Sequence, residues 1–250
     1  MCRLFAYSGP PRDLAPFLLG EGSLEALACE HNDGWGLATW DAGVARVRKE
    51  PVAADAPKSG WRATVAATRA PLVLAHIRKG STGRVTIENT HPFSSGPWAF
   101  AHNGTIQGMD SARAALLAEI EPSVRAGVRG ATDSEVAFAM FLNRLLAYPE
   151  GLRTRLEDAL PALVYVARRL RRELPGTVEE PTKTTFLAGN GDGILGTRWI
   201  RELFVYQGED FAVVASEPVG PKVDGWREVV DGATVVLQGG RVRVRSPDVG

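Results

Sequence analysis

The chain has 250 residues, and its 29 lysines and arginines balance 29 aspartates and glutamates. A neutral chain is not expected to bind nucleic acid in general, or to be held on a membrane by charge, because both need an excess of basic residues. Its apolar runs are too short for a membrane span or a signal peptide, so we expect a cytoplasmic protein folded as one domain over residues 1–250.

Strands are expected in the first hundred residues. Residues 44–48 alternate apolar and polar side chains, and residues 34–40 form a strand-like run with a glycine-rich start. Asp41-Ala42-Gly43 is the expected turn between them. The runs 72–77 and 97–102 are mostly apolar and predict buried strands.

The middle of the chain is expected to be helical. A helix over residues 110–120 could be capped by Asp110 or Ser111. Thr132-Asp133-Ser134-Glu135 is a stronger start signal, because a Thr or Asp before a Glu caps the amphipathic pattern that follows up to Leu145. A third helix is expected over 156–174.

The last part is rich in strands, with turns at Asp192-Gly193 and Gly239-Gly240. The expected strands cover residues 184–188, 203–206, 211–215, 234–237 and 241–245. Helices grouped between two sets of strands indicate an α+β fold rather than a βαβ winding.

Cysteine chemistry first gives a specific signal at residue 2. The two cysteines are too few for a disulfide scaffold, and with the four histidines they lack zinc-site spacing, so we expect no metal or other cofactor. Cys29 is expected to be a small buried residue. If Met1 is removed, Cys2 carries a free α-amino group, whose pKa of about 7.7–8.0 lets it take the thiol proton.

Other candidate residues each have a functional and a purely structural interpretation. Asn103 and Gly104 could aim two donors at an oxyanion or form an ordinary Asn-Gly turn. Arg78 could bind a carboxylate through two hydrogen bonds or lie in solvent at a strand end. Asp133 could bind an ammonium group or cap its helix. His91 could donate to a substrate, although packing in a loop is slightly favoured.

Together these groups describe one kind of site. A nucleophilic thiol, an oxyanion pair, a cation for a carboxylate and an anion for an ammonium fit an α-amino acid that carries an amide further out. Glutamine or a γ-glutamyl compound is such a molecule.

The same residues lie in motifs that resemble those of class II (N-terminal nucleophile) glutamine amidotransferases, in particular the small stand-alone branch. The motifs are Met1-Cys2-Arg3, Asn32-Asp33-Gly34-Trp35-Gly36, Ala75-His76-Ile77-Arg78, Glu88-Asn89-Thr90-His91-Pro92-Phe93, Ala101-His102-Asn103-Gly104, Thr132-Asp133-Ser134-Glu135 and Ala215-Ser216-Glu217-Pro218. Their number and order make the resemblance specific.

The resemblance implies a four-layer αββα sandwich of the N-terminal nucleophile hydrolase type. It implies that Cys2 attacks the γ-amide and forms a γ-glutamyl thioester, while Asn103 and the Gly104 N–H stabilise the oxyanion. The substrate-binding residues it implies are Arg78 for the α-carboxylate, Asp133 for the α-ammonium, and His91 and His102 as further pocket residues.

Several functional alternatives stay open at this point. Larger members carry a synthase domain that receives ammonia, for which 250 residues leave no room. Lys79-Gly80-Ser81-Thr82 also differs from the large synthases, so a γ-glutamyl peptide could replace glutamine as substrate. The alternatives are an amino-acid-binding scaffold without catalysis, or a subunit that supplies ammonia to a partner. A cysteine hydrolase of fatty-acyl amides would need neither Arg78 nor Asp133.

Overall fold

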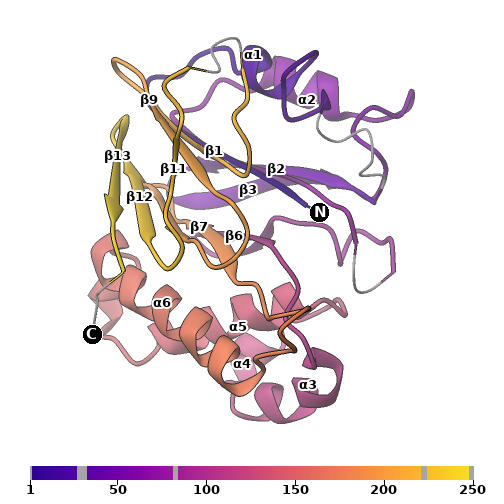
Figure 1. Cartoon of the computed structure of the whole chain (residues 1–250), viewed down its shortest axis with the longest axis vertical. Coiled ribbons are helices and arrows are strands. Elements are labelled where there is room, and N and C mark those ends of the chain that lie inside the picture. Colours follow the sequence, from indigo (N-terminus) through magenta and orange to yellow (C-terminus); the bar gives the residue numbers. More distant parts are fainter. Residues whose placement is uncertain (1, 27–32, 81–83, 221–223, 248–250) are drawn as a thin grey trace.

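Two antiparallel sheets lie face to face at the centre of the protein, with helices outside each of them (Figure 1). This computed structural model describes residues 2–26, 33–80, 84–220 and 224–247. Asn32 and Cys29, considered above, lie outside the described residues. Within those ranges, no helix has both the length and the hydropathy that a membrane crossing requires.

The first sheet has seven strands and contains the start of the chain. In spatial order they are β11 (Arg227–Glu228), β9 (Phe204–Gln207), β10 (Ala212–Ala215), β1 (Arg3–Ser8), β4 (Leu72–Ile77), β2 (Trp35–Asp41) and β3 (Val44–Glu50). The second sheet has six: β13 (Arg241–Arg245), β12 (Thr234–Gln238), β8 (Ile194–Thr197), β7 (Thr185–Gly189), β6 (Trp98–Asn103) and β5 (Phe93–Ser95).

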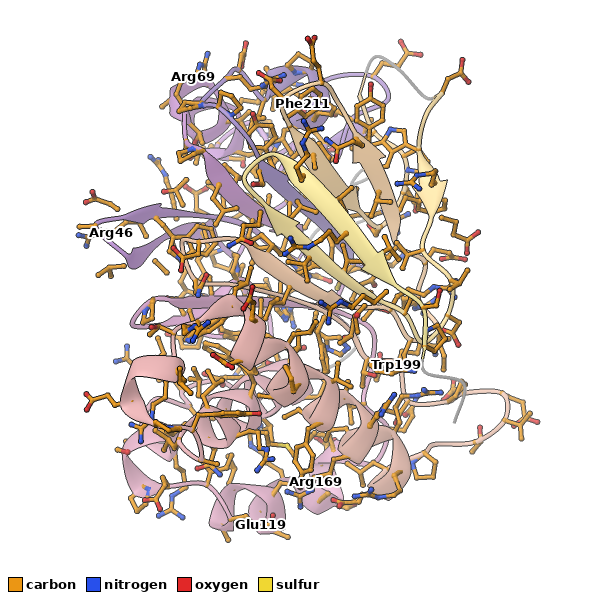
Figure 2. The ribbon with its side chains drawn as sticks, turned by 90° about the vertical axis from the view of Figure 1, so that its left-hand side faces the viewer. Arg46, Arg69, Glu119, Arg169, Trp199 and Phe211 are labelled. Carbon is orange, nitrogen blue, oxygen red and sulfur yellow. The ribbon has the colours of Figure 1, made fainter. Side chains whose placement is uncertain are left out.

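Helices cover the outer face of each sheet (Figure 1). The short helices α1 (Ala15–Leu18) and α2 (Trp61–Ala67) lie against the seven-stranded sheet. The six-stranded sheet is covered by α3 (Met109–Ala118), α4 (Pro122–Arg125), α5 (Asp133–Leu145), a 3-10 turn (Glu150–Leu152) and α6 (Leu156–Glu173). An ion pair of 2.7 Å between Arg169 and Glu119 joins α6 to the end of α3 (Figure 2).

Alternation of side chains along the strands creates the layers. In β1, Leu4 and Ala6 belong to the core between the sheets, whereas Phe5 and Tyr7 belong to the core under α1 and α2. All four are fully buried, so each face of this strand is covered. A third core lies between the second sheet and α3 to α6. These three cores separate four layers, which confirms the predicted α+β sandwich.

The same alternation decides which sheet face carries each residue at the end of the strands where the candidate site lies. In β6, Ala99 and Ala101 face the other sheet and Phe100 faces the helices, so Asn103 continues on the inner face and His102 on the helix face. Cys2 precedes β1 and is two residues from Leu4, so the alternation places both on the inner face. The strand pattern therefore directs Cys2 and Asn103 toward the space between the two sheets.

The start of α3 differs from the prediction. The helix begins at Met109, after Gly108 in a left-handed conformation with φ of 68°, and no side chain caps it. Asp110 lies inside the first turn instead of at the cap, where its charge still complements the helix N-terminus. The predicted cap of α5 is confirmed, because Thr132 Oγ1 accepts a hydrogen bond from Glu135 N at 3.2 Å.

Candidate active site

A small cleft brings together almost all the residues that the sequence singled out. It has a volume of about 20 Å³ and is lined by Cys2, Arg78, Lys79, Gly80, His91, His102, Gly104, Thr132, Asp133 and Ser134. Every predicted site residue except Asn103 is in this set. Residues from distant parts of the chain therefore meet at one end of the sandwich.

Strand pairing explains why Cys2 and Arg78 are neighbours. Arg3 of β1 pairs with Ile77 of β4, so the next residue in each direction is Cys2 on one chain segment and Arg78 on the other. The Cys2 thiol donates to the carbonyl oxygen of Lys79 at 3.3 Å. This register holds the sulfur beside the guanidinium-bearing end of β4.

The Cys2 thiol is protonated at neutral pH in this environment. Burial raises the pKa of the thiol, and the negative charge of Asp133 raises it further, while the positive charge of Arg78 opposes the shift. A thiol with a raised pKa is a weak nucleophile by itself, so it needs a base close to the sulfur.

Arg78 is buried and held by the start of β2. Only 2% of the residue is exposed, and its backbone N–H donates to Gly34 O at 2.7 Å. The guanidinium donates to Asp33 O at 3.5 Å, and the Asp33 carboxylate accepts from Gly80 N at 2.7 Å. Asp33 thus ties both Arg78 and the loop that follows it to the start of β2.

Asp133 is the first residue of α5 and does not cap the helix, since Thr132 fills that role. Its Oδ1 accepts from Ser134 N at 2.7 Å and its Oδ2 from Ile106 N at 2.7 Å. With 4% exposure, the carboxylate is held rigidly at the wall of the cleft. A buried carboxylate in this position can accept a cationic group from a ligand.

His102 is oriented by two hydrogen bonds. Its Nε2–H donates to Lys183 O at 2.8 Å, so Nδ1 accepts from the Ser134 hydroxyl at 2.9 Å. Burial lowers the pKa of His102, which keeps the ring neutral. A Cβ on Gly104 would overlap the Lys183 carbonyl and lie 2.6 Å from His102 Nε2. Only glycine fits here, so the Gly104 backbone can face the cleft.

His91 packs in a layer of rings at the cleft wall. Its ring centroid is 4.2 Å from that of His76 and 4.5 Å from that of Phe93. Both ring nitrogens are buried and have no hydrogen-bond partner among the described residues. Burial places the pKa of His91 well below its usual range, so a neutral imidazole faces the cleft.

Asn103 stands beside the cleft but does not line it. The residue is 4% exposed, and within the described ranges no hydrogen bond engages its side-chain amide. The alternation of side chains along β6 places Asn103 on the face toward the other sheet, and the alternation along β1 places Cys2 on the corresponding inner face.

Sequence reasoning missed part of the cleft wall. Lys79, Gly80 and Ser134 line it, and Thr132 does so in addition to capping α5. Their positions next to Arg78 and Asp133 in the motifs were the available signal. Within the ranges that the structure describes, no three His, Cys, Asp or Glu side chains group closely enough to hold a metal ion.

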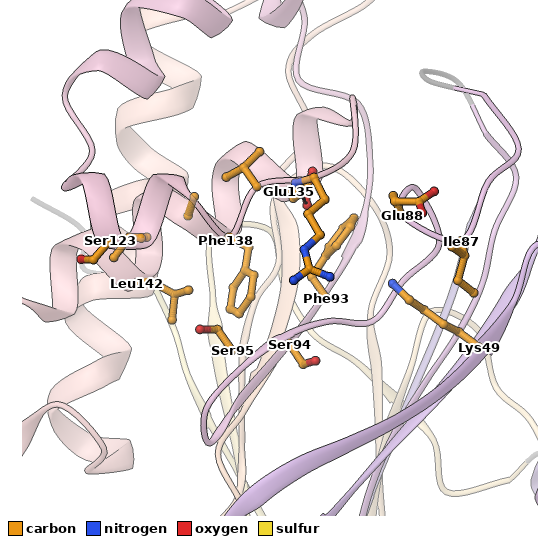
Figure 3. A pocket seen from close by; sticks show the side chains of 15 residues that line it. Lys49, Ile87, Glu88, Phe93, Ser94, Ser95, Ser123, Glu135, Phe138 and Leu142 are labelled. Carbon is orange, nitrogen blue, oxygen red and sulfur yellow. Dashed lines mark hydrogen bonds between the residues drawn. The ribbon is translucent and has the colours of Figure 1, made fainter.

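A larger cavity of about 570 Å³ lies elsewhere and shares no lining residue with the cleft. Figure 3 shows Lys49 and Glu88 on one side of it and Leu142 and Ser123 on the other. Lys49 Nζ donates to Thr90 O at 2.6 Å, and burial lowers the pKa of this amine to about 8.

Comparison with known families identifies the class of protein. The sequence model of class-II glutamine amidotransferases matches residues 1–194. The chain belongs to the class-II glutamine amidotransferase family.

Two curated relatives illustrate the range of lengths in this family. The γ-glutamyl-hercynylcysteine sulfoxide hydrolase of Mycolicibacterium smegmatis is 29% identical over 245 residues, which cover 92% of this chain and 93% of the relative. The putative glutamine amidotransferase YafJ of Escherichia coli is 29% identical over 150 residues, which cover 58% of this chain and 55% of YafJ. The match thus spans nearly all of one relative and about half of the other.

Solved structures share the fold. A glutamine aminotransferase class-II domain protein from Silicibacter pomeroyi superposes with a TM-score of 0.72 at 23% identity, covering 98% of this chain and 99% of that one. The glutamine phosphoribosylpyrophosphate amidotransferase of Bacillus subtilis gives 0.69 at 17% identity, covering 100% of this chain and 50% of that one. The predicted N-terminal nucleophile hydrolase type of fold is confirmed.

Proposed function

We propose that this protein is an N-terminal cysteine amidohydrolase that cleaves the γ-amide of glutamine or of a γ-glutamyl compound. The observation that carries the proposal is the meeting of Cys2, Arg78 and Asp133 in one cleft. A nucleophile, a buried cation and a buried anion in one small space match the three groups of such a substrate. The intact set disfavours a scaffold without catalysis, and the two charges disfavour a fatty-acyl amide.

Substrate recognition in this proposal is by opposite charges. Arg78 binds the α-carboxylate through two parallel hydrogen bonds, and Asp133 binds the α-ammonium. Both residues are less than 5% exposed, so water screens these contacts only weakly. Holding both groups at the α-carbon leaves the side-chain amide to extend toward Cys2. His91 lines the same cleft and can donate one hydrogen bond from its neutral ring.

The first chemical step requires removal of Met1, which frees the α-amino group of Cys2. That amine accepts the thiol proton, and Sγ attacks the amide carbonyl carbon to form the C–S bond. The resulting oxyanion accepts hydrogen bonds from the Gly104 N–H and the Asn103 amide. The ammonium then gives its proton to the leaving nitrogen as the C–N bond breaks, which leaves a γ-glutamyl thioester.

The second step regenerates the enzyme. Water attacks the thioester carbonyl and loses a proton to the α-amine of Cys2, the C–S bond breaks, and the thiolate regains that proton. Glutamate leaves. His102 and Ser134 act as positioning residues, because their hydrogen bonds fix the segment that carries Gly104.

The relatives support a hydrolase with a leaving group larger than ammonia. The Mycolicibacterium smegmatis relative is named as a hydrolase of a γ-glutamyl compound and aligns over nearly its full length. An ammonia-supplying role beside a partner subunit would use the same thioester chemistry. A panel of glutamine, glutathione and other γ-glutamyl amides separates these uses.

A diazo-ketone analogue of glutamine tests the proposal through intact mass. The processed protein should gain one adduct, and Cys2→Ala should gain none while it stays folded. Cys29→Ala, which removes the second of the two cysteines in the sequence, should keep the adduct. Labelling of Cys2→Ala, or no labelling of the processed wild type, would contradict the proposal.

A further inference from the structure

Strand order places a second arginine across Cys2 from Arg78. In the seven-stranded sheet β4 lies on one side of β1, and β10 and then β9 lie on the other. Phe5 pairs with Ala215, which pairs with Phe204, so continuing both registers brings Arg201 level with Cys2. Strands are about 4.8 Å apart, so the backbones of Arg78 and Arg201 stand roughly 5 Å and 10 Å from that of Cys2.

Arg201 also faces the correct side of the sheet. Leu203 and Val205 belong to the core between the sheets, and alternation puts Arg201 on that same inner face, with Cys2. On the other side of β9, the backbone pairing with the segment after β11 extends beyond the strand to Leu203, because Val229 N donates to Leu203 O at 2.8 Å.

A hydrogen bond ties Arg201 to the second sheet at the candidate oxyanion site. Thr185 Oγ1 donates to Arg201 O at 3.0 Å, and Thr185 is the pairing partner of Asn103. Burial and the nearby Arg201 charge lower the pKa of both Lys183 and His102. Arg201 therefore lies close to the side of the cleft that carries Asn103 and Gly104.

The Arg201 guanidinium makes no hydrogen-bonded ion pair among the described residues, although the negative charge of Glu202 acts on it and raises its pKa against the larger effect of burial. Its Nε is buried without a hydrogen bond, as are those of Arg3 and Arg198. Those two arginines differ from Arg201 in that each makes an ion pair through Nη2, with Glu217 at 2.6 Å and with Glu228 at 2.9 Å. Burial lowers the pKa of Arg201, but a guanidinium stays protonated at neutral pH. A partly buried cation whose carboxylate neighbour makes no ion pair with it can still bind an anionic ligand.

We propose that Arg201 binds a carboxylate on the leaving group, so that the preferred substrate is a γ-glutamyl amino acid or peptide rather than glutamine. This inference rests on the proposed function, because it takes the amide at Cys2 and the α-carboxylate at Arg78 as given. The leaving group then extends toward β9, and Arg201 is a specificity-determining residue that does not touch the reacting atoms.

Two substrates that differ only at that carboxylate test the idea in the wild-type protein. γ-Glutamylglycine carries the carboxylate, and γ-glutamylglycinamide replaces it with a neutral amide. A charge-assisted hydrogen bond predicts that kcat/KM for the first is about tenfold or more higher. The difference should appear mainly in KM, because the contact is made equally in the bound and transition states.

Variants locate the effect. Arg201→Gln should bring the ratio of the two kcat/KM values close to one, and Arg201→Lys should give an intermediate ratio. Arg168→Gln removes an exposed charge on α6 and should keep the wild-type ratio. A wild-type ratio of one, or an unchanged ratio in Arg201→Gln, would overturn the inference while leaving the proposed function in place. Failure of the wild type to hydrolyse any γ-glutamyl amide, glutamine included, would instead refute the proposed function.

Discussion

Asp133→Asn removes the charge that is proposed to bind the α-ammonium while nearly preserving the shape. Asp133 is 4% exposed, and its two carboxylate oxygens accept hydrogen bonds from the backbone N–H groups of Ser134 and Ile106. An asparagine keeps one of these acceptors and turns an NH₂ group toward the other N–H. The substitution therefore weakens ligand binding and, to a smaller extent, the start of α5.

The expected loss follows from burial and charge. Removing the charge of one partner in a poorly screened, charge-assisted contact costs about 2–4 kcal/mol of binding free energy. This corresponds to a loss of roughly 30-fold to 1000-fold in kcat/KM. A further loss of about 1 kcal/mol in the free energy of unfolding is expected from the first turn of the helix. Only the first effect requires an ammonium group on the substrate.

Steady-state kinetics with two amides separate these effects. Glutamine carries the α-ammonium, and glutaramate is the same amide without it. Asp133→Asn should lose kcat/KM strongly for glutamine and weakly for glutaramate, so the preference for glutamine falls. Asp110→Asn, the same change in the exposed first turn of α3, should keep the wild-type preference. Equal losses on both amides in Asp133→Asn would refute the role in ammonium binding.

Three further outcomes are expected. Protein that retains Met1 should hydrolyse γ-glutamyl amides far more slowly than processed protein, because its α-amine belongs to Met1 and the nitrogen of Cys2 is in a peptide bond. The two forms are separated and checked by intact mass, and equal rates would exclude the terminal amine as base. Gly104→Ala should lower the free energy of unfolding by more than about 1 kcal/mol through overpacking, as measured by urea denaturation, whereas Gly151→Ala, whose new Cβ meets nothing within 4 Å, should not. The pKa of Lys49, lowered from 10.5 to about 8, means that the unfolded state binds more protons between these values, so stability rises with pH there. Relative to Lys49→Met, the wild type should gain about 2 kcal/mol across that range after allowance for solvent screening; a flat difference in unfolding free energy would contradict the lowered pKa.

The sequence predicts elements well where one periodicity dominates. Strand β3 alternates at its surface edge, and α5 combines a cap with an amphipathic stripe. Strand β1 was not predicted, because both of its faces are buried and its apolar run lacks alternation. The start of α3 was misplaced because Gly108, not a capping side chain, turns the chain there. The single-domain organisation stays a prediction.

The site follows the same division between local and long-range information. Residue types in short motifs indicate a thiol, a guanidinium and a carboxylate, and the fold brings Cys2, Arg78 and Asp133 to one cleft. The roles of these residues, and that of Asn103 beside the cleft, stay predictions. Arg201 could not be found from local sequence, because its place depends on the order of β9, β10, β1 and β4 in the sheet.

The most direct measurement is the intact mass of processed protein that is quenched in acid during turnover of γ-glutamylglycine. A covalent species heavier by one glutamyl group, mapped to the peptide that begins with Cys2, is the expected result. Steady turnover without this species, together with hydrolysis by Cys2→Ala, would show that the amide is cleaved by another route.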